Sequence, residues 1–205
     1  VAWDTDGETV VWLEGRSGHG VLVSQSSLGD AACDLTSDLS VRAKVGYGGG
    51  DSTVADGHVY FAAHLNGQLY RQRLSEGAAR PVTSSFGSAC SPAVSPDGAS
   101  IAYVHNDGVG NDRIAVVDSE GKHWPQVLVS GHDFFMQPRW SPDGRRLCWI
   151  AWDHPNMPWD GTTLYVADVL DGSSLLPRLG EARAIAGGSD IAIFQPEFID
   201  DRRIA

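Results

Sequence analysis

The chain has 205 residues, of which 15 are basic and 26 acidic, and its formal net charge is −11. Binding nucleic-acid phosphates requires a basic patch, yet no run of Lys and Arg here is longer than two residues. No apolar run approaches the ~20 residues that a membrane-spanning helix needs. Composition therefore argues against a nucleic-acid partner and against a membrane partner.

A turn containing Asp-Gly, often preceded by proline, recurs along the chain. Proline presets one backbone angle and glycine accepts the left-handed conformation, so each copy between two apolar runs predicts a β-hairpin. The hairpin strands are expected within residues 1–12, 50–61, 91–104 and 137–150, with turn glycines Gly7, Gly57, Gly98 and Gly144. These glycines are 50, 41 and 46 residues apart, and such a period indicates a repeat architecture.

A third and a fourth strand are predicted in every unit. The third strands are expected at residues 20–24, 68–72, 113–117 and 163–167. Shorter fourth strands are expected at residues 33–36, 80–83, 126–129 and 183–186. Four antiparallel strands in a period of about 40 to 50 residues are typical of one β-propeller blade.

The predicted fold class is therefore all-β, a β-propeller of four-stranded antiparallel blades. A β-sandwich also has short strands separated by Gly and Pro, but it does not explain why four segments recur in one order. No stretch keeps helical apolar spacing for three turns without Gly or Pro. We expect one partial propeller domain over residues 1–205, with approximate blades at 1–46, 47–90, 91–136 and 137–194 and the start of another at 195–205.

The ring of blades is expected to be incomplete, because residues 195–204 restart the repeat, with Arg202 in place of the turn glycine. Propellers have about 4 to 8 blades, and each blade buries its faces only against its neighbours. A closed four-bladed ring with a tail is the alternative. An open ring leaves apolar blade faces and strand edges uncovered, so we expect self-association of a chain that is part of a longer protein.

The residues themselves offer no catalytic, cofactor-binding or metal-binding constellation. The G-x-S-x-G motif of a hydrolase nucleophile is absent. His58 and His64 are six residues apart, and His123 and His132 nine, so neither pair matches a helical or zinc-ribbon metal site. We predict no catalytic residue, no cofactor and no metal in this chain, and the residues alone leave open whether the protein is an enzyme.

Two segments differ from ordinary turns. A Tyr-Gly-Gly-Gly run at residues 47–50 is either a loop near a substrate or a place of close approach at the propeller axis. Residues 152–161 replace a short hairpin with a ten-residue loop rich in aromatic residues and proline. Its side chains either anchor an interface or fold back to cap their own blade, with Asp153 and Asp160 as turn caps. The candidate contact residues are Tyr47, Trp152, His154, Asn156, Met157 and Trp159.

Three cysteines, Cys33, Cys90 and Cys148, form no CxxC pair. In a strand-rich chain an isolated cysteine is usually a small buried hydrophobe, so we expect these three to lie in the core. Unpaired cysteines also favour a reducing compartment, and we expect a cytoplasmic protein. Removal of an export signal upstream of Val1 is the alternative.

Longer strings carry a family resemblance. Residues 131–147 read Gly-His-Asp-Phe-Phe-Met-Gln-Pro-Arg-Trp-Ser-Pro-Asp-Gly-Arg-Arg-Leu, and residues 152–164 read Trp-Asp-His-Pro-Asn-Met-Pro-Trp-Asp-Gly-Thr-Thr-Leu. With the Tyr-Gly-Gly-Gly run, they resemble the N-terminal propeller of prolyl oligopeptidase family serine peptidases, in particular the acylaminoacyl-peptidase and dipeptidyl-aminopeptidase-like members. Ser-Pro-Asp-Gly alone is shared with TolB-like propellers of WD40-like repeats. The chain departs from the family pattern at Gly46, where an acidic residue is usual.

The resemblance implies a two-domain enzyme in which the propeller covers an α/β-hydrolase domain and limits which peptides reach its Ser, Asp and His. None of those catalytic residues can be carried over to this chain. The predicted function is a non-catalytic propeller that gates peptide access and docks on the hydrolase domain, so the expected partners are a peptide substrate and that domain. A TolB-like scaffold that binds protein partners is the alternative.

Overall fold

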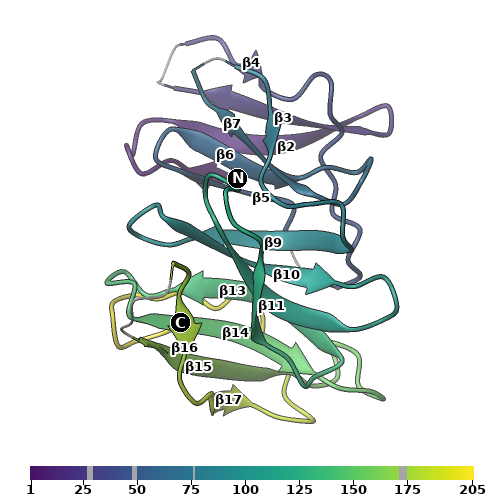
Figure 1. Cartoon of the computed structure of the whole chain (residues 1–205), viewed down its shortest axis with the longest axis vertical. Coiled ribbons are helices and arrows are strands. Elements are labelled where there is room, and N and C mark those ends of the chain that lie inside the picture. The colour runs from purple at the N-terminus through teal and green to yellow at the C-terminus, as the bar shows by residue number, and fades with distance from the viewer. Residues whose placement is uncertain (27–29, 48–49, 76, 171–174) are drawn as a thin grey trace.

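The computed structural model describes residues 1–205 except 27–29, 48–49, 76 and 171–174, and the described residues contain strands but no helix. The strands form four antiparallel sheets stacked side by side (Figure 1). Blade 1 consists of β1 (Ala2–Trp3), β2 (Val10–Arg16), β3 (His19–Gln25) and β4 (Cys33–Asp34). Blade 2 consists of β5 (Ser52–Ala55), β6 (His58–Ala62), β7 (Leu69–Arg73) and β8 (Arg80–Pro81).

The second half of the chain repeats this arrangement. Blade 3 consists of β9 (Ser88–Val94), β10 (Ser100–Asn106), β11 (Asp112–Asp118) and β12 (Gln126–Val129). Blade 4 consists of β13 (Phe134–Trp140), β14 (Arg146–Trp152), β15 (Thr163–Leu170), β16 (Arg178–Leu179) and β17 (Arg183–Gly187). The predicted propeller of four-stranded antiparallel blades is confirmed. The sequence missed β16, which pairs with the far end of the long β15 while β17 takes the expected fourth position.

The Asp-Gly turns close the hairpins as expected. Ala55 pairs directly with His58, and Asp56 and Gly57 have φ of 51° and 72°, so this turn has the two left-handed residues of a type I′ hairpin. The Pro-Asp-Gly copies make a longer turn, in which the Gly98 N–H donates to the Ser95 carbonyl at 2.8 Å. Proline and glycine therefore fix the hairpins locally.

A fifth hairpin begins after blade 4. Phe198 and Ile204 form an antiparallel bridge, and the Ile199 N–H donates to the Arg203 carbonyl at 2.9 Å. Although the sequence lacks the usual glycine here, the Asp200 carboxylate accepts the backbone N–H groups of Arg202 and Arg203 at 2.9 Å each. A side chain thus completes the turn that Pro-Asp-Gly makes elsewhere.

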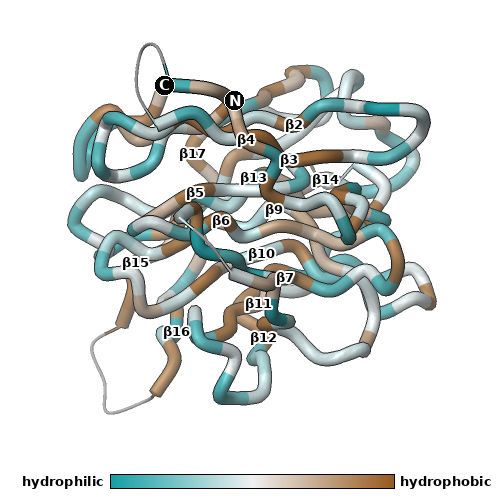
Figure 2. Tube along the Cα trace, turned by 90° about the horizontal axis from the view of Figure 1, so that it is seen from above, coloured by the Kyte–Doolittle hydropathy of each residue, from teal (hydrophilic) through white to brown (hydrophobic). Residues whose placement is uncertain are grey.

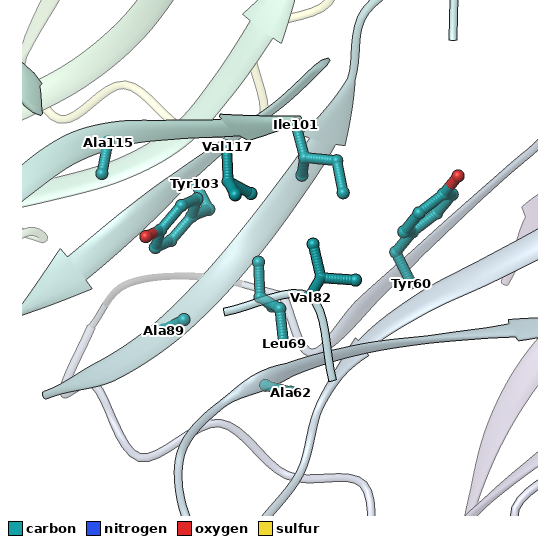
Figure 3. Packing of buried hydrophobic residues seen from close by; sticks show 9 residues of the cluster. All are labelled: Tyr60, Ala62, Leu69, Val82, Ala89, Ile101, Tyr103, Ala115 and Val117. Carbon is teal, nitrogen blue, oxygen red and sulfur yellow. The ribbon is translucent and has the colours of Figure 1, made fainter. Parts of the chain in front are cut away.

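Apolar side chains fill the spaces between blades. Figure 3 shows the cluster between blades 2 and 3, where Leu69 and Val82 meet Ile101 and Val117. A second cluster joins blades 3 and 4 around the fully buried Trp149. Figure 2 shows apolar stretches along the strands inside the molecule and hydrophilic loops around it. The core is therefore radial, with each blade buried against the next.

The cysteines follow this division of inside and outside. Cys90 and Cys148 are fully buried, and burial raises the pKa of each thiol. Cys33 is exposed, so the expectation that it lies in the core was wrong. It lies on β4, the short outermost strand of blade 1, where few neighbours can cover a side chain.

The first strands of the blades surround a central cavity. Its volume is about 450 Å³, and its lining includes Ala2 of β1, Thr53 of β5, Ala93 of β9 and Arg139 of β13. Glu197 from the fifth hairpin also lines it, and the Arg139 Nε donates to its Oε1 at 2.8 Å. The cavity marks the propeller axis, and each described unit contributes a wall to it.

Candidate functional site

The loops fall on two opposite faces because neighbouring strands within a blade are antiparallel. The Asp-Gly turns that join first and second strands lie on one face, which we call the turn face. The loops that join second and third strands, together with the connectors between blades, lie on the other, which we call the loop face. Both segments singled out in the sequence, at Tyr47 and at 152–161, belong to the loop face.

The structure brings these two segments together in one aromatic cluster. The Tyr47 ring centroid lies 6.1 Å from that of Trp159 and 6.5 Å from that of Trp152, with the rings edge to face in both pairs. Phe134, at the start of β13, stacks on Trp152 at 5.1 Å and meets Tyr47 edge to face at 6.1 Å. We call Tyr47, Phe134, Trp152 and Trp159 the aromatic shelf.

The two tryptophans of the shelf differ in exposure. Trp152 is 4 % exposed and belongs to the core cluster of blade 4, so it caps its own blade. Trp159 is 61 % exposed and Tyr47 is 48 % exposed. The fold-back alternative therefore describes Trp152, which supports the shelf from below, whereas Trp159 presents its surface to solvent.

Carboxylates hold the loop of residues 152–161 in place. The Asp153 Oδ2 accepts a hydrogen bond from the His132 Nδ1 at 2.8 Å, and its Oδ1 accepts the Asp133 N–H at 2.8 Å. Burial raises the pKa of Asp153, but the hydrogen bond from His132 and that from Asp133 outweigh it, so the net shift is downward. Asp160 accepts the Met157 N–H at 2.9 Å. Asp160 thus caps its own turn as the sequence suggested, whereas Asp153 instead ties the loop to the segment before β13.

The remaining predicted contact residues have different roles. The His154 ring lies edge to face on Phe134 at 4.9 Å, so it extends the shelf. The Asn156 Nδ2 donates to the Ser189 carbonyl at 2.8 Å, which ties the loop to the segment after β17. Met157 is half-buried in the loop. His154 is therefore the one polar side chain of this set that lies against the shelf.

The connector before β5 explains how Tyr47 reaches blade 4. Ala43 and Val45 pack against the cluster between blades 3 and 4, so this connector crosses over from blade 1. Tyr47 has a left-handed φ of 61°, and the Gly50 carbonyl accepts the Ser91 N–H at 2.8 Å beside the central cavity. A Cβ on Gly50 would lie at an ordinary contact distance of 3.7 Å from Ser91, so its left-handed φ of 85° rather than close approach requires glycine, while Gly48 and Gly49 lie outside the described residues. Phe134 was missed from the sequence because nothing in its spacing marks a partner for Tyr47.

The shelf and its surroundings provide binding chemistry. Over the described part of the chain, no group of three or more His, Cys, Asp and Glu side chains is arranged to hold a metal ion. A hollow of about 310 Å³ next to the shelf is lined by His132, Asp153, His154 and Tyr165. Two exposed aromatic rings beside a polar hollow are typical of a surface that contacts a protein or a peptide.

The comparison with protein families identifies the class. The sequence model of the lipoprotein LpqB β-propeller domain matches residues 67–169, which is half of the chain, and the chain belongs to this family. The matched region runs from the end of blade 2 through blade 3 into blade 4. In addition, the described residues form no helix that is long and apolar enough to cross a membrane.

Solved structures add similarity to the propellers of puromycin-hydrolysing proteins. The chain is 26 % identical to a Mycobacterium tuberculosis puromycin-hydrolyzing peptidase, with a TM-score of 0.80 over 95 % of this chain and 33 % of that one. It is 28 % identical to a puromycin hydrolase, with a TM-score of 0.80 over 93 % of this chain and 33 % of that one. The predicted resemblance to the propeller of such a peptidase is confirmed, and the chain spans about a third of these proteins.

The chain is also similar to TolB proteins. The Tol-Pal system protein TolB of Xanthomonas campestris pv. campestris (strain B100) is 32 % identical over 76 residues, which are 36 % of this chain and 16 % of that protein. The structure of TolB from Acinetobacter baumannii matches with a TM-score of 0.62 at 18 % identity, over 89 % of this chain and 44 % of that one, which shows the fold alone. The predicted TolB-like character is confirmed at the level of the propeller.

Proposed function

We propose that this propeller is the non-catalytic domain of a serine peptidase, where it gates the access of peptides to an α/β-hydrolase domain and docks on that domain. One observation carries the proposal: identity of 26 to 28 % to puromycin-hydrolysing proteins extends over 93 to 95 % of this chain but only a third of theirs. The rest of such a protein has room for a hydrolase domain. In this proposal the chemistry belongs to that domain and the propeller selects what reaches it.

The aromatic shelf is the contact surface in this proposal. Tyr47 and Trp159 present rigid apolar rings on the loop face, and such residues are frequent among the few that dominate the binding energy of an interface. Trp152 and Phe134 stack beneath them at 5.1 Å, so the exposed rings stand on a fixed base. A preformed surface of this kind loses little conformational entropy when a domain or a peptide binds to it.

Trp159→Ala in the full-length protein tests the proposal. We expect kcat/KM for peptide hydrolysis to change by about fivefold or more, because removing an interface tryptophan typically costs over ~1 kcal/mol. Hydrolysis of an aminoacyl p-nitroanilide and of a decapeptide should be compared, since a gate affects long substrates more than short ones. Leu65→Ala is the matched control, because Leu65 is 79 % exposed on the same face but lies outside the shelf. Unchanged kinetics of Trp159→Ala toward both substrates would contradict the proposed role of the shelf.

A scaffold that binds protein partners is the second candidate, and the 32 % identity to TolB over 76 residues favours it. A fluorophosphonate probe separates the two, since it labels an activated serine nucleophile covalently. Labelling of the full-length protein is expected for the peptidase. A full-length protein that folds but is neither labelled nor able to cleave peptides would favour the scaffold.

A further inference from the structure

A pocket between blades 2 and 3 lies apart from the aromatic shelf. Its volume is about 100 Å³, and its inner wall consists of Ala89, Tyr103 and Ala115 from the cluster in Figure 3. Phe86 and Trp124 line its outer part and are 58 % and 68 % exposed. The enclosed volume is somewhat smaller than the ~150 Å³ cavity that holds a benzene ring, but this pocket is open on one side. A six-membered ring can therefore enter it with its attachment point outside.

Two largely buried residues in the wall of this pocket carry polar groups that have no hydrogen-bond partner among the described residues. Tyr103 is 2 % exposed, and its hydroxyl makes no hydrogen bond within the described part of the chain. In Figure 3 this hydroxyl points away from Ile101, toward the end of the cluster where Ala89 and Ala115 lie. His105 is 9 % exposed, its ring is also without a hydrogen bond there, and Phe86 stacks on it at 5.7 Å. Neither the Tyr103 hydroxyl nor a His105 ring nitrogen is among the fully buried unpaired atoms of the described chain, so both are reached through the pocket and are free to hydrogen-bond a ligand with a polar atom.

The charge of the pocket defines the ligand further. Burial lowers the pKa of His105, so its ring is neutral at neutral pH and offers one donor and one acceptor. Arg113 lies at the pocket but is paired with Asp107 at 3.2 Å. A neutral aromatic group with one hydroxyl, such as the phenol of tyrosine, suits an apolar pocket that is open on one side and offers two unpaired polar groups.

An open strand edge beside the pocket indicates that the phenol arrives on a peptide. β12 pairs with β11 on one side, and no strand among the described residues pairs with its other edge. Gln126 and Val127 of β12 line the pocket and are exposed. An unpaired edge presents backbone N–H and C=O groups that an extended peptide can satisfy, while alternate side chains enter neighbouring pockets.

We propose that the cleft between blades 2 and 3 binds an extended peptide that pairs with the outer edge of β12 and inserts a tyrosine side chain into the pocket beside Tyr103 and His105. The phenol hydroxyl exchanges hydrogen bonds with the Tyr103 hydroxyl and a His105 ring nitrogen. The site takes up a side chain without cleaving the peptide. None of its residues belongs to the aromatic shelf, so the site is independent of the proposed peptidase role.

Calorimetric titration of this chain with capped pentapeptides tests the proposal. The probes are Thr-Val-Tyr-Val-Thr and its versions with Phe or Ala at the centre. We expect the Tyr peptide to bind at least about tenfold more tightly than the Ala peptide, since the Ala peptide buries no ring. Tyr103→Phe should weaken the Tyr peptide about three- to tenfold and change the Phe peptide by less than twofold, because only the hydroxyl is removed.

The controls make the outcome decisive. Tyr70→Phe removes a hydroxyl that accepts a hydrogen bond from Asn66 at 2.9 Å in another part of blade 2, and it should leave binding unchanged. Two further Tyr peptides carry N-methyl groups, one on the odd-numbered and the other on the even-numbered backbone amides. Only alternate amides of an extended peptide face the neighbouring strand, so one of these two peptides should lose binding and the other should keep it. Equal binding of the Tyr and Ala peptides, no binding by the folded chain, or an unchanged preference for Tyr over Phe in Tyr103→Phe would each overturn the proposal.

Discussion

Individual glycines show how closely the backbone segments approach one another. Gly187 has a left-handed φ of 88°, and a Cβ there would collide with the carbonyl oxygen of Thr162. Gly7 has a left-handed φ of 69°, but nothing lies within 4 Å of its Cβ position. Both need glycine for their backbone angle, and Gly187 also needs it for space. Glycine is thus required in the turn for its backbone angle alone, and at the end of β17 for both its backbone angle and its lack of a side chain.

Gly187→Ala should therefore destabilise the protein more than Gly7→Ala. For Gly7→Ala we expect a loss of about 1 kcal/mol, because only left-handed strain is added. For Gly187→Ala we expect a loss of about 3 kcal/mol or more, because steric conflict with the backbone is added to the strain. Urea unfolding of the two variants measures both values. Equal losses would show that the contact with Thr162 relaxes without cost.

At the scale of the element, acidic side chains organise the hairpin turns. The Ser95 hydroxyl donates to the Asp97 carboxylate at 2.6 Å, and the Ala99 N–H donates at 3.0 Å. These two hydrogen bonds lower the pKa of Asp97 below its ordinary value of 3.8. Asp143 makes the equivalent bonds to Ser141 and Arg145. The Pro-Asp-Gly turn is thus stabilised by the ionised form of its aspartate.

The contribution of Asp97 should depend on pH in a defined direction. Because its pKa is lowered in the folded protein, the stabilisation is complete above the unfolded value near 3.8 and disappears as the pH falls through the folded value. Asp97→Ala should cost about 1 kcal/mol of unfolding free energy at pH 7 and much less at a pH of about 2.5. Urea unfolding at the two pH values measures this. Glu181→Ala, at an exposed residue without a hydrogen bond in the described chain, is the control; a pH-independent loss in Asp97→Ala would contradict the prediction.

At the scale of the whole molecule, the two end blades expose apolar side chains that inner blades bury. Trp3 lies on the face of blade 1 turned away from Ala2 and Val11, which pack toward blade 2, and it is 63 % exposed. Phe194 and Ile199, after blade 4, are 50 % and 60 % exposed. In a propeller such surfaces are covered by a neighbouring blade. A second copy of the chain has the same exposed apolar surfaces, and these can cover the end surfaces of the first copy.

We expect the isolated chain to self-associate through these end surfaces. Sedimentation velocity between about 1 and 100 μM should show a concentration-dependent shift toward dimers or larger species, because large uncovered apolar surfaces favour association. Trp3→Lys should reduce the shift, since it places a charge on the blade 1 surface. Leu65→Lys is the matched control at an exposed residue away from both end surfaces. A monomer over the whole range would contradict self-association.

The sequence alone predicted the hairpins and the order of strands, because turn chemistry and strand alternation are local properties. Pro96 and Gly98 specify their turn whatever surrounds it, and the carboxylate of Asp160 caps its own turn in the same way. These local rules did not predict β16, the exposure of Cys33 or the different burial of Trp152 and Trp159.

Tertiary structure decided what these elements form together. Tyr47 meets Phe134 and Trp159 only because the connector before β5 crosses to blade 4. Tyr103 and His105 face a pocket only because blade 3 stands next to blade 2. Such contacts join residues that are many positions apart, and their geometry depends on how whole blades stack. The sequence thus determined the blades, and their stacking determined which distant side chains meet at the surface.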